Sequence, residues 1–311
     1  MKHAFVFPGQ GSQTVGMLAE LATIYPIVKQ TFEQASDVVG YDLWQLSQTG
    51  PEELLNQTDK SQPALLAANV AIWRVWRERG GTQPSIMAGH SFGEYSALVC
   101  AEALTFTEGV QLAQDRGRFM QDAVPIGVGA VAALLGLEET KVLAICKQVA
   151  QDQVVSAVNF NAPNQIVIAG HATAVERAIV EAKSAGAKRA VLLPISVPVH
   201  CSLMQPAVEK MARRLEQVTI NIPKIPVLHN IDITVKTDTT AIRQALSAQI
   251  DHPVHWIKTI QTIAAEGITH IFECGPGKVL TGLNKRIAKE IKSLPIYDQQ
   301  TLDQALKIVE L

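Results

Sequence analysis

The sequence has 311 residues, of which 47% are hydrophobic and 18% charged, and its formal net charge at pH 7 is −2. This length allows a large buried core and predicts two domains. The near-neutral balance excludes a global electrostatic attraction to nucleic acid or to an anionic membrane, so a phosphate-bearing partner would need a local basic patch.

The cysteines and the N-terminal residues indicate the cellular compartment of the protein. The four cysteines form no Cys-x-x-Cys pair and no Cys/His cluster of zinc spacing: Cys100, Cys146, Cys201 and Cys274. We therefore expect reduced thiols and no metal site. The apolar run at residues 4–7 stops at Pro8, and no stretch approaches the length of a membrane span, so we expect a cytoplasmic protein without a signal peptide.

The N-terminal part begins with a strand pattern at residues 4–7, followed by a loop at residues 8–13 with glycines on both sides of Gln10. Backbone at such glycines can approach a ligand closely, although plain tight turns have the same pattern. Helical patterns follow at residues 25–39, 51–55 and 62–79. The last of these starts at Gln62-Pro63, because proline is favoured in the first turn of a helix.

The segment Gly89-His90-Ser91-Phe92-Gly93 has the Gly-x-Ser-x-Gly pattern of a nucleophile elbow, a sharp strand-to-helix turn that exposes a serine. Residues 84–88 are typical of a buried strand and residues 94–101 of a buried helix. The same pentapeptide occurs in plain strand-to-helix turns, but these flanks favour a nucleophile. In hydrolases with this elbow, oxyanion N–H donors come from the residue after the serine and from an earlier loop, here Phe92 and Gln10.

The next helix contains an arginine with two possible roles. Thr105 and Glu108 have the spacing of a capping box, which predicts a helix start. Arg116 then falls near the middle of this helix, among Gly117, Phe119 and Met120. An arginine of a surface helix normally lies on its polar face, so the position alone favours neither a solvated nor a buried side chain.

Residues 126–195 have a different organisation. They contain strand and helix patterns in the order β-α-β-β-α-β, at residues 129–137, 138–150, 154–160, 165–169, 173–185 and 189–193. This order is that of the ferredoxin-like split unit. Prolines at both ends of the segment indicate a small domain, residues 126–195, inserted into a larger one formed by residues 1–125 and 196–311.

His200 is the histidine that we expect to act as a base. It precedes a helical pattern at residues 203–218, and a helix N-terminus favours the neutral imidazole that a general base needs. A lone histidine is more often a hydrogen-bonded structural residue, but Ser91 requires a base.

The remaining chain alternates strands and helices. Strand patterns occur at residues 227–230 and 268–273, and helical patterns at residues 242–250, 255–265 and 279–289. Outside the inserted segment, this alternation predicts a parallel sheet covered by helices on both faces.

These motifs together resemble the malonyl-CoA:acyl carrier protein transacylase family of bacterial fatty-acid synthesis. The similarity covers nearly the whole chain through six segments: residues 5–13, 62–64, 89–94, 116–120, 197–200 and 275–278. The resemblance implies an α/β-hydrolase-like large domain with a parallel sheet and an inserted ferredoxin-like domain, which agrees with the order of elements.

The resemblance also implies the roles of particular residues. Ser91 is the expected nucleophile and His200 its base, while the N–H groups of Gln10 and Phe92 hold the oxyanion. At the position of Phe92 the family more often has leucine, and the larger ring would alter the width of the pocket.

Three further positions come from the same resemblance. Arg116 is expected to bind the free carboxylate of malonate, and Gln62 to line the pocket. The backbone carbonyl of Gln249 is expected to orient the imidazole in place of the usual aspartate.

The implied activity is that of an acyltransferase that moves malonyl from malonyl-CoA to the phosphopantetheine thiol of acyl carrier protein through a malonyl-serine ester. It needs malonyl-CoA as substrate and no bound cofactor, and nothing in the sequence demands more than a monomer. An acidic carrier protein would dock on local positive charge, and two clusters are candidates: Lys188 with Arg189, and Lys285 with Arg286 and Lys289.

Three alternatives remain at this point. A serine esterase shares the elbow but commonly has the order serine, acid, histidine and needs no buried arginine. A catalytically silent carrier-binding module would not need Ser91, His200 and Arg116 together. A free-standing polyketide acyltransferase would use the same chemistry with another carrier.

Overall fold

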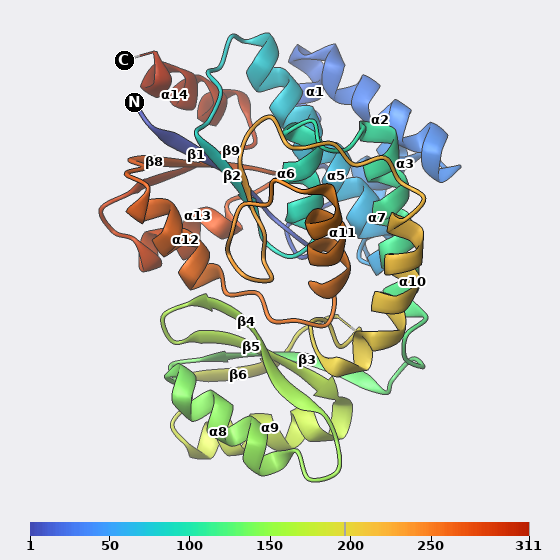
Figure 1. The fold of residues 1–311 in the computed structure, drawn as a ribbon, viewed down its shortest axis with the longest axis vertical. Helices are drawn as coiled ribbons and strands as arrows, with labels where there is room; N and C mark the ends of the chain where they lie inside the picture. The colour runs from blue at the N-terminus through green and yellow to red at the C-terminus, as the bar shows by residue number, and fades with distance from the viewer. Residues whose placement is uncertain (196, 311) are drawn as a thin grey trace.

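A computed structural model describes residues 1–195 and 197–310. Its larger unit is built on a five-stranded sheet, in which every neighbouring pair is parallel. The strand order is β7 (Val227–Leu228), β2 (Ile86–Gly89), β1 (His3–Phe7), β8 (His270–Cys274), β9 (Lys292–Ile296). The predicted parallel sheet is therefore confirmed, and Figure 1 shows it in the upper part of the molecule.

The central strand β1 is buried on both faces because its side chains alternate between two cores. Phe5 and Phe7 pack on the face covered by α5 (Thr58–Glu78) and α14 (Gln299–Val309), where the Phe5 and Trp76 rings lie 5.1 Å apart. Ala4 and Val6 pack on the other face, against Trp256 of α12 (Trp256–Ala265) and its neighbours. Helices thus cover both faces of this sheet, as the alternation of patterns predicted.

The helices of the larger unit have these bounds: α1 (Ala19–Ile24), α2 (Pro26–Val39), α3 (Leu43–Thr49), α4 (Glu52–Leu55), α5 (Thr58–Glu78), α6 (Gly93–Cys100), α7 (Phe106–Gln121), α10 (Gln205–Leu215), α11 (Thr239–Ala248), α12 (Trp256–Ala265), α13 (Val279–Ile287) and α14 (Gln299–Val309). A short 3-10 helix, η1 (Ser202–Met204), precedes α10.

The predicted start of α5 at Gln62 is wrong by four residues. The helix begins at Thr58 and contains Pro63 in its second turn. The N–H groups of Lys60 and Ser61 donate to the carbonyl of Gln57 at 2.9 and 2.7 Å, so the helical bonds start upstream of the proline. Pro63 is therefore a residue that the helix tolerates near its start, and it does not mark the first residue of the helix.

Strand β9 and helices α1, α3 and α14 have no counterpart among the predicted elements. β9 contains Lys292 and Pro295, which weaken a strand pattern, and it lies at the sheet edge, where proline is tolerated. Two of the missed helices carry a start signal in the sequence. The Asp42 side chain accepts from the N–H of Gln45, and Asp298 forms a capping box with Thr301.

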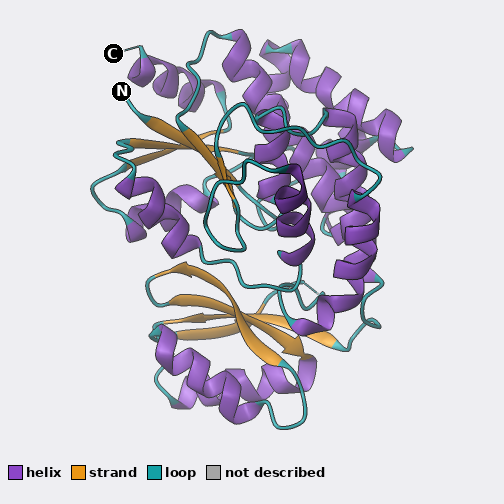
Figure 2. Cartoon of the chain, viewed as in Figure 1, coloured by secondary structure: helices purple, strands orange, loops and turns teal. Residues whose placement is uncertain are grey.

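The smaller unit is a four-stranded antiparallel sheet with two helices on one face, in the lower part of Figures 1 and 2. Its elements follow the predicted order: β3 (Gly129–Leu135), α8 (Glu139–Val149), β4 (Val155–Ala162), β5 (Gln165–His171), α9 (Ala172–Ser184) and β6 (Arg189–Leu192). The expected boundary at residue 196 and the last residue, 311, lie outside the described residues.

The face of this smaller sheet opposite α8 and α9 turns toward the larger unit. Val131, Val158 and Val167 of that face form a cluster with Cys201, the residue after His200. Backbone hydrogen bonds between β4 and Val254 join the two units directly. The smaller sheet therefore covers the region that contains Ser91 and His200.

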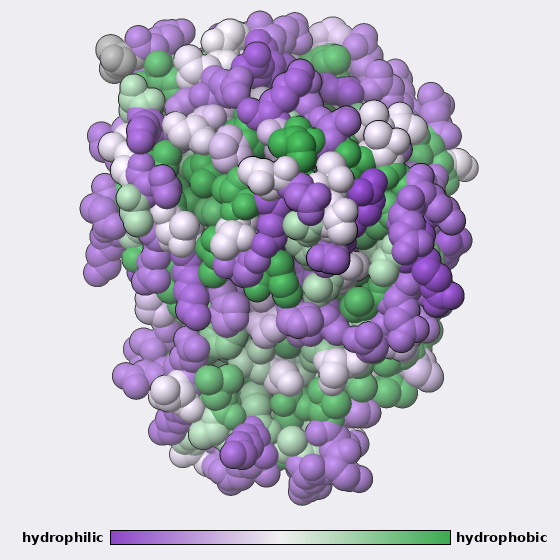
Figure 3. Space-filling view, in the orientation of Figure 1, coloured by the Kyte–Doolittle hydropathy of each residue, from purple (hydrophilic) through white to green (hydrophobic). Residues whose placement is uncertain are grey.

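Surface properties agree with these layers. On the face drawn in Figure 3, hydrophilic side chains cover the outer helices, and hydrophobic ones gather in patches over the middle of the larger unit and over the smaller one. Among residues 1–195 and 197–310, none of the helices combines the length and the apolar composition needed to cross a membrane.

Candidate active site

Ser91 lies on a sharp turn between β2 and α6, as the Gly-x-Ser-x-Gly pattern predicted. Its φ is +52°, in the left-handed region that side chains rarely adopt. Two glycines make the turn possible. A Cβ on Gly89 would lie 1.9 Å from the carbonyl carbon of Gly93, and one on Gly93 would lie 2.0 Å from the Phe7 oxygen. The backbone at these positions has no room for any other residue.

The structure brings Ser91 and His200 together across 109 residues of sequence. The Ser91 Oγ and the His200 Nε2 are 2.7 Å apart, and the His200 Nδ1 is 2.7 Å from the backbone oxygen of Gln249. A carbonyl only accepts, so Nδ1 carries the proton and donates to it. The Nε2 lone pair is then free to accept the hydroxyl proton of Ser91.

Gln249 can offer its carbonyl because it is the C-cap of α11. The last carbonyls of a helix have no partner within the helix, so they are open to a side chain that approaches the helix end. His200 itself is buried, 2% exposed, and is followed by η1 and α10 rather than by one helix from residue 203.

Burial and the nearby positive charge of Arg116 lower the pKa of His200 from 6.5 to about 3. Both effects disfavour the imidazolium. The imidazole is therefore neutral, and able to accept a proton, at any pH well above 3.

This predicts a pH profile that differs from that of an ordinary histidine. We expect Ser91 to react with an uncharged fluorophosphonate at a rate that does not fall until the pH approaches 4. In the Arg116→Ala variant, the acidic limb moves to higher pH because one of the two causes of the low pKa is removed. The measurement is the labelling rate between pH 4 and 9, and an inflection near 6.5 in the unsubstituted protein would contradict the assignment.

Arg116 is buried, 1% exposed, and its side chain reaches the candidate nucleophile. Its Nη2 lies 3.5 Å from the Ser91 Oγ and donates to the Gln249 Oε1 at 2.8 Å. The neighbouring Asp115 pairs with Arg214 and Arg118 instead. Within residues 1–195 and 197–310, no carboxylate lies within 4 Å of the Arg116 guanidinium.

Of the two interpretations of Arg116, the solvated one is therefore wrong. Burial lowers the pKa of its guanidinium and leaves its Nε without a hydrogen-bond partner among the described residues. A buried cation with no carboxylate in contact is unfavourable, so this position is suited to an anion that arrives from outside the chain.

Gln10 and Phe92 both line the cavity beside Ser91. In the part of the chain that the structure describes, neither backbone N–H donates to a protein acceptor. Gly9 allows the loop at residues 8–13 to approach the elbow closely, because a Cβ at this position would lie only 2.6 Å from the His90 oxygen. Both N–H groups therefore belong to residues that line the cavity and have no protein acceptor among the described residues.

The Phe92 ring is buried and stacks on Tyr95, with 5.7 Å between ring centroids. The Arg116 guanidinium carbon lies 5.9 Å from the centroid of Phe92 and 5.6 Å from that of Tyr95. The Phe92 and Tyr95 rings therefore both lie beside the Arg116 guanidinium.

Gln62 is buried but does not belong to the cavity wall. Its Nε2 contacts the Sδ of Met120 at 3.7 Å, and Met120 is the residue that lines the cavity. The side chains of Ser91, His200, Arg116 and Gln249 are thus brought together, while Gln62 lies behind them.

Sequence reasoning missed Asn230, Glu94 and His229, which lie beneath the elbow. Asn230 accepts from the Ser91 N–H at 2.9 Å, and it contacts the buried Glu94 carboxylate. A glutamate in the first turn of an otherwise apolar helix was the available signal, because a buried carboxylate requires donors. His90, next to Ser91, is held by Asn161 of the smaller sheet, 2.7 Å from its Nε2.

The cavity at Ser91 has a volume of about 150 Å³ and lies between the two units. Its walls come from the elbow, from Asn159 and Asn161 of β4, and from Leu280 and Leu283 of α13. No group of three or more His, Cys, Asp or Glu residues that could hold a metal ion occurs in the described ranges.

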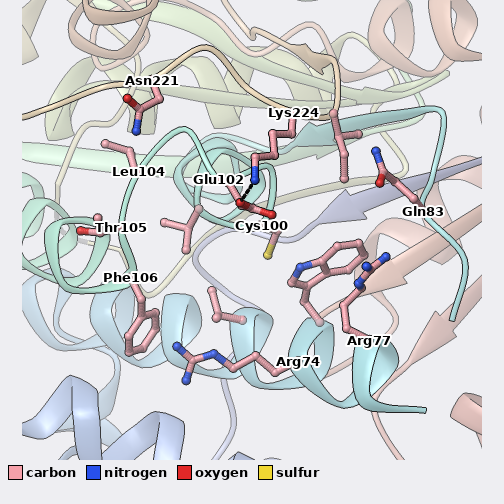
Figure 4. A pocket seen from close by; sticks show the side chains of 14 residues that line it. Arg74, Arg77, Gln83, Cys100, Glu102, Leu104, Thr105, Phe106, Asn221 and Lys224 are labelled. Carbon is pink, nitrogen blue, oxygen red and sulfur yellow. Dashed lines mark hydrogen bonds and ion pairs between the residues drawn. The ribbon is translucent and has the colours of Figure 1, made fainter. Parts of the chain in front are cut away.

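A second cavity of about 500 Å³ lies away from Ser91, between α5, the end of α6 and residues 221–225. Figure 4 shows its two arginines, Arg74 and Arg77, at opposite ends. Arg74 donates away from the cavity to Thr31 and Gln34, and Lys224 pairs with Glu102. Its thiol, that of Cys100, has a pKa raised well above 9.0 by burial. These side chains do not converge on one point.

The fold and the site define an acyl transferase. The family model of the acyl transferase domain matches residues 4–298. A malonyl CoA-acyl carrier protein transacylase of Salmonella typhimurium is 54% identical over 303 residues, with 97% of this chain and 98% of that protein covered. One of Bacillus subtilis is 41% identical, with 99% and 98% covered. The chain belongs to the malonyl CoA-acyl carrier protein transacylase family.

Solved structures agree with this assignment. The transacylase of this kind from Coxiella burnetii is 50% identical, with a TM-score of 0.98 over 99% of this chain and 98% of that one. A malonyl-transacylase in complex with a type II PKS acyl-carrier protein is 53% identical, also with a TM-score of 0.98, over 99% of this chain and 100% of that one. These likenesses confirm an α/β fold with a parallel sheet.

Proposed function

We propose that this chain transfers the malonyl group of malonyl-CoA to the phosphopantetheine thiol of an acyl carrier protein in fatty-acid synthesis. The observation that supports this substrate is the Arg116 guanidinium, buried without a carboxylate partner in the described residues and 3.5 Å from the Ser91 Oγ. A guanidinium binds a carboxylate through two parallel hydrogen bonds. Malonyl has a free carboxylate at one end and a thioester at the other.

The reaction has two half-steps with the same residues. Ser91 Oγ attacks the thioester carbon while the His200 Nε2 takes the hydroxyl proton. The N–H groups of Gln10 and Phe92 hold the oxyanion, each contributing about 3 kcal/mol. The carbon–sulfur bond then breaks, and His200 returns the proton to the coenzyme A sulfur. The carrier thiol reverses these steps on the malonyl-serine ester, which predicts ping-pong kinetics.

Intact-mass analysis tests this function. The protein is mixed in turn with malonyl-CoA, methylmalonyl-CoA and acetyl-CoA, and then with a phosphopantetheinylated carrier protein. We expect a gain of one malonyl group on Ser91 that the carrier removes, and less acylation by acetyl-CoA. Rapid hydrolysis of p-nitrophenyl esters without transfer to the thiol would instead support the esterase alternative.

We propose that the chain consists of two domains. Residues 1–125 and 196–311 form an α/β-hydrolase-like domain, and residues 126–195 a ferredoxin-like insertion. The β-α-β-β-α-β order and the separate antiparallel sheet support the second name. The elbow at the end of β2 supports the first. We infer that the protein is a monomer and works in the cytoplasm. It needs no bound cofactor, because the chain itself supplies the nucleophile, the base and the oxyanion donors.

For the carrier protein, we infer docking on the cluster Lys285, Arg286 and Lys289 rather than on Lys188 and Arg189. Lys285 and Arg286 belong to α13 and Lys289 follows its end, while Leu280 and Leu283 of this helix line the Ser91 cavity. Arg286 donates to the Pro163 oxygen at 2.9 Å and so spans the two units beside that cavity. An acidic partner at this edge would place its phosphopantetheine next to the entrance.

Charge reversal at Lys285 and Lys289 together is expected to raise the KM for carrier protein about tenfold at low salt and less at high salt. Acylation of Ser91 by malonyl-CoA alone should not change. Steady-state kinetics with varied carrier provide the measurement. The matched control reverses Lys188 and Arg189, which are also exposed. An equal effect of the control would contradict docking on α13.

The polyketide alternative has one observation in its favour. The solved malonyl-transacylase that is 53% identical to this chain is bound to a type II PKS acyl-carrier protein. The chemistry at Ser91 would be the same, so only comparison of carrier proteins as acceptors separates the two pathways.

A further inference from the structure

One side chain bonds to the backbone of the nucleophile elbow at two points, the carbonyl of Gly89 and the N–H of the strained residue Ser91. The Asn230 Nδ2 donates to the Gly89 oxygen at 2.7 Å, and its Oδ1 accepts from the Ser91 N–H at 2.9 Å. Gly89 is the last residue of β2, and Ser91 lies in the turn that follows, before α6 begins at Gly93. Asn230 lies 139 residues after Ser91 in the sequence and is 5% exposed.

The elbow needs such a restraint because Ser91 has a φ of +52°. A residue held in this region is strained, and the surrounding contacts must hold it there. Relaxation of the backbone would move the Oγ away from the His200 Nε2, now 2.7 Å distant. It would also redirect the Phe92 N–H that follows in the chain.

Asn230 is oriented in turn by a buried carboxylate. The Glu94 Oε2 accepts from the Asn230 backbone N–H at 2.8 Å and from its Nδ2 at 2.5 Å. The Glu94 Oε1 lies 2.7 Å from the His229 Nδ1, and neither Glu94 nor His229 is exposed by more than 1%. These bonds fix which end of the amide is oxygen, because a flipped amide would point its NH₂ group at the N–H of Ser91.

We propose that Asn230 is a positioning residue that fixes the Ser91 backbone for attack, and that the Glu94 charge sets the direction of its amide. This role deepens the proposed function and rests on it. Among the described residues, Asn230 does not line the Ser91 cavity. Its effect therefore reaches the reaction only through Ser91.

Three variants test the role. Asn230→Asp keeps the shape, but it removes the donor to Gly89 and adds a negative charge beside Glu94. Asn230→Ser keeps an oxygen and adds no charge. Glu94→Gln leaves Asn230 in place and removes the charge that orients it. The matched control is Asn284→Asp, at a buried asparagine that accepts from the Trp256 Nε1 and donates to Ser293, and whose side-chain bonds therefore do not involve the elbow backbone.

Two rates are measured on folded protein: labelling of Ser91 by a neutral fluorophosphonate, and acylation by malonyl-CoA. In the first, the Ser91 oxygen displaces fluoride from phosphorus, so it reports the nucleophile without any malonyl recognition. We expect both rates to fall together, about 100-fold in Asn230→Asp, because a misplacement of about 1 Å costs about that factor. The loss is about tenfold in Glu94→Gln, since a neutral oxygen orients the amide less strongly. The KM for malonyl-CoA stays within about twofold.

Several results would overturn the proposal. They are unchanged labelling in Asn230→Asp and Glu94→Gln, a loss no larger than that of Asn284→Asp, or a loss of acylation with normal labelling. Failure of all three test variants to fold would assign the network to stability alone and also overturn it. If the unsubstituted protein labels at Ser91 but transfers no malonyl, the proposed function fails, while the labelling rates still decide the role of Asn230.

Discussion

Ser91→Ala is expected to abolish the acyl-enzyme. The variant lacks the only hydroxyl placed 2.7 Å from the His200 Nε2 in the described residues, so no covalent step remains. Loss of a serine nucleophile in comparable enzymes costs about a million-fold in kcat. Intact-mass analysis after mixing with malonyl-CoA should show the unmodified protein, and transfer to carrier protein should fall to background.

The control for this variant is Ser202→Ala, which removes an exposed hydroxyl two residues after His200. It should acylate at the normal rate. Malonylation that persists in Ser91→Ala would assign the nucleophile to another residue and would remove the basis of the two-step reaction.

Arg116→Ala is expected to change which acyl group is transferred. Removing one partner of a buried charge pair costs about 3 to 5 kcal/mol, so kcat/KM for malonyl-CoA should fall about 100- to 1000-fold or more. Acetyl-CoA has no carboxylate, so its transfer should fall far less. The ratio of the two kcat/KM values, measured with the same carrier protein, is the quantity that checks this.

Arg118→Ala serves as the matched control on the same helix. Arg118 is exposed and pairs with Asp115, so its loss should leave the ratio unchanged. Equal losses of malonyl and acetyl transfer in Arg116→Ala would show that Arg116 supports the fold of the cavity and does not select the substrate.

The sequence predicted those features that depend on neighbouring residues. The elbow at Ser91 could be recognised because its glycines and its strand and helix flanks are adjacent in the chain. The split order of residues 126–195 followed from the periodicity of each segment. The start of α5 was misplaced because Pro63 is favoured at a helix start and is also tolerated in the second turn.

Features that depend on distant residues could not be predicted from patterns alone. Whether Arg116 faced solvent or the nucleophile was open, since both faces of α7 carry apolar residues nearby and only the packing decides. The bond between Asn230 and the Ser91 N–H joins residues 139 positions apart, and no spacing rule connects them. Gln62, whose role came only from the resemblance, contacts Met120 and not the cavity.

The acceptor behind the imidazole is a peptide carbonyl at the end of α11, and this has a consequence for electrostatics and for evolution. A carbonyl orients His200 without placing a full negative charge near a substrate that is itself an anion. It is also present whatever amino acid occupies position 249, so single substitutions cannot delete it. The Gln249 side chain has contacts of its own: its Oε1 accepts from Arg116 at 2.8 Å, and its Nε2 donates to the Ser91 backbone oxygen at 3.2 Å. Variation at this position would therefore tune recognition of the acyl group while the proton relay persists.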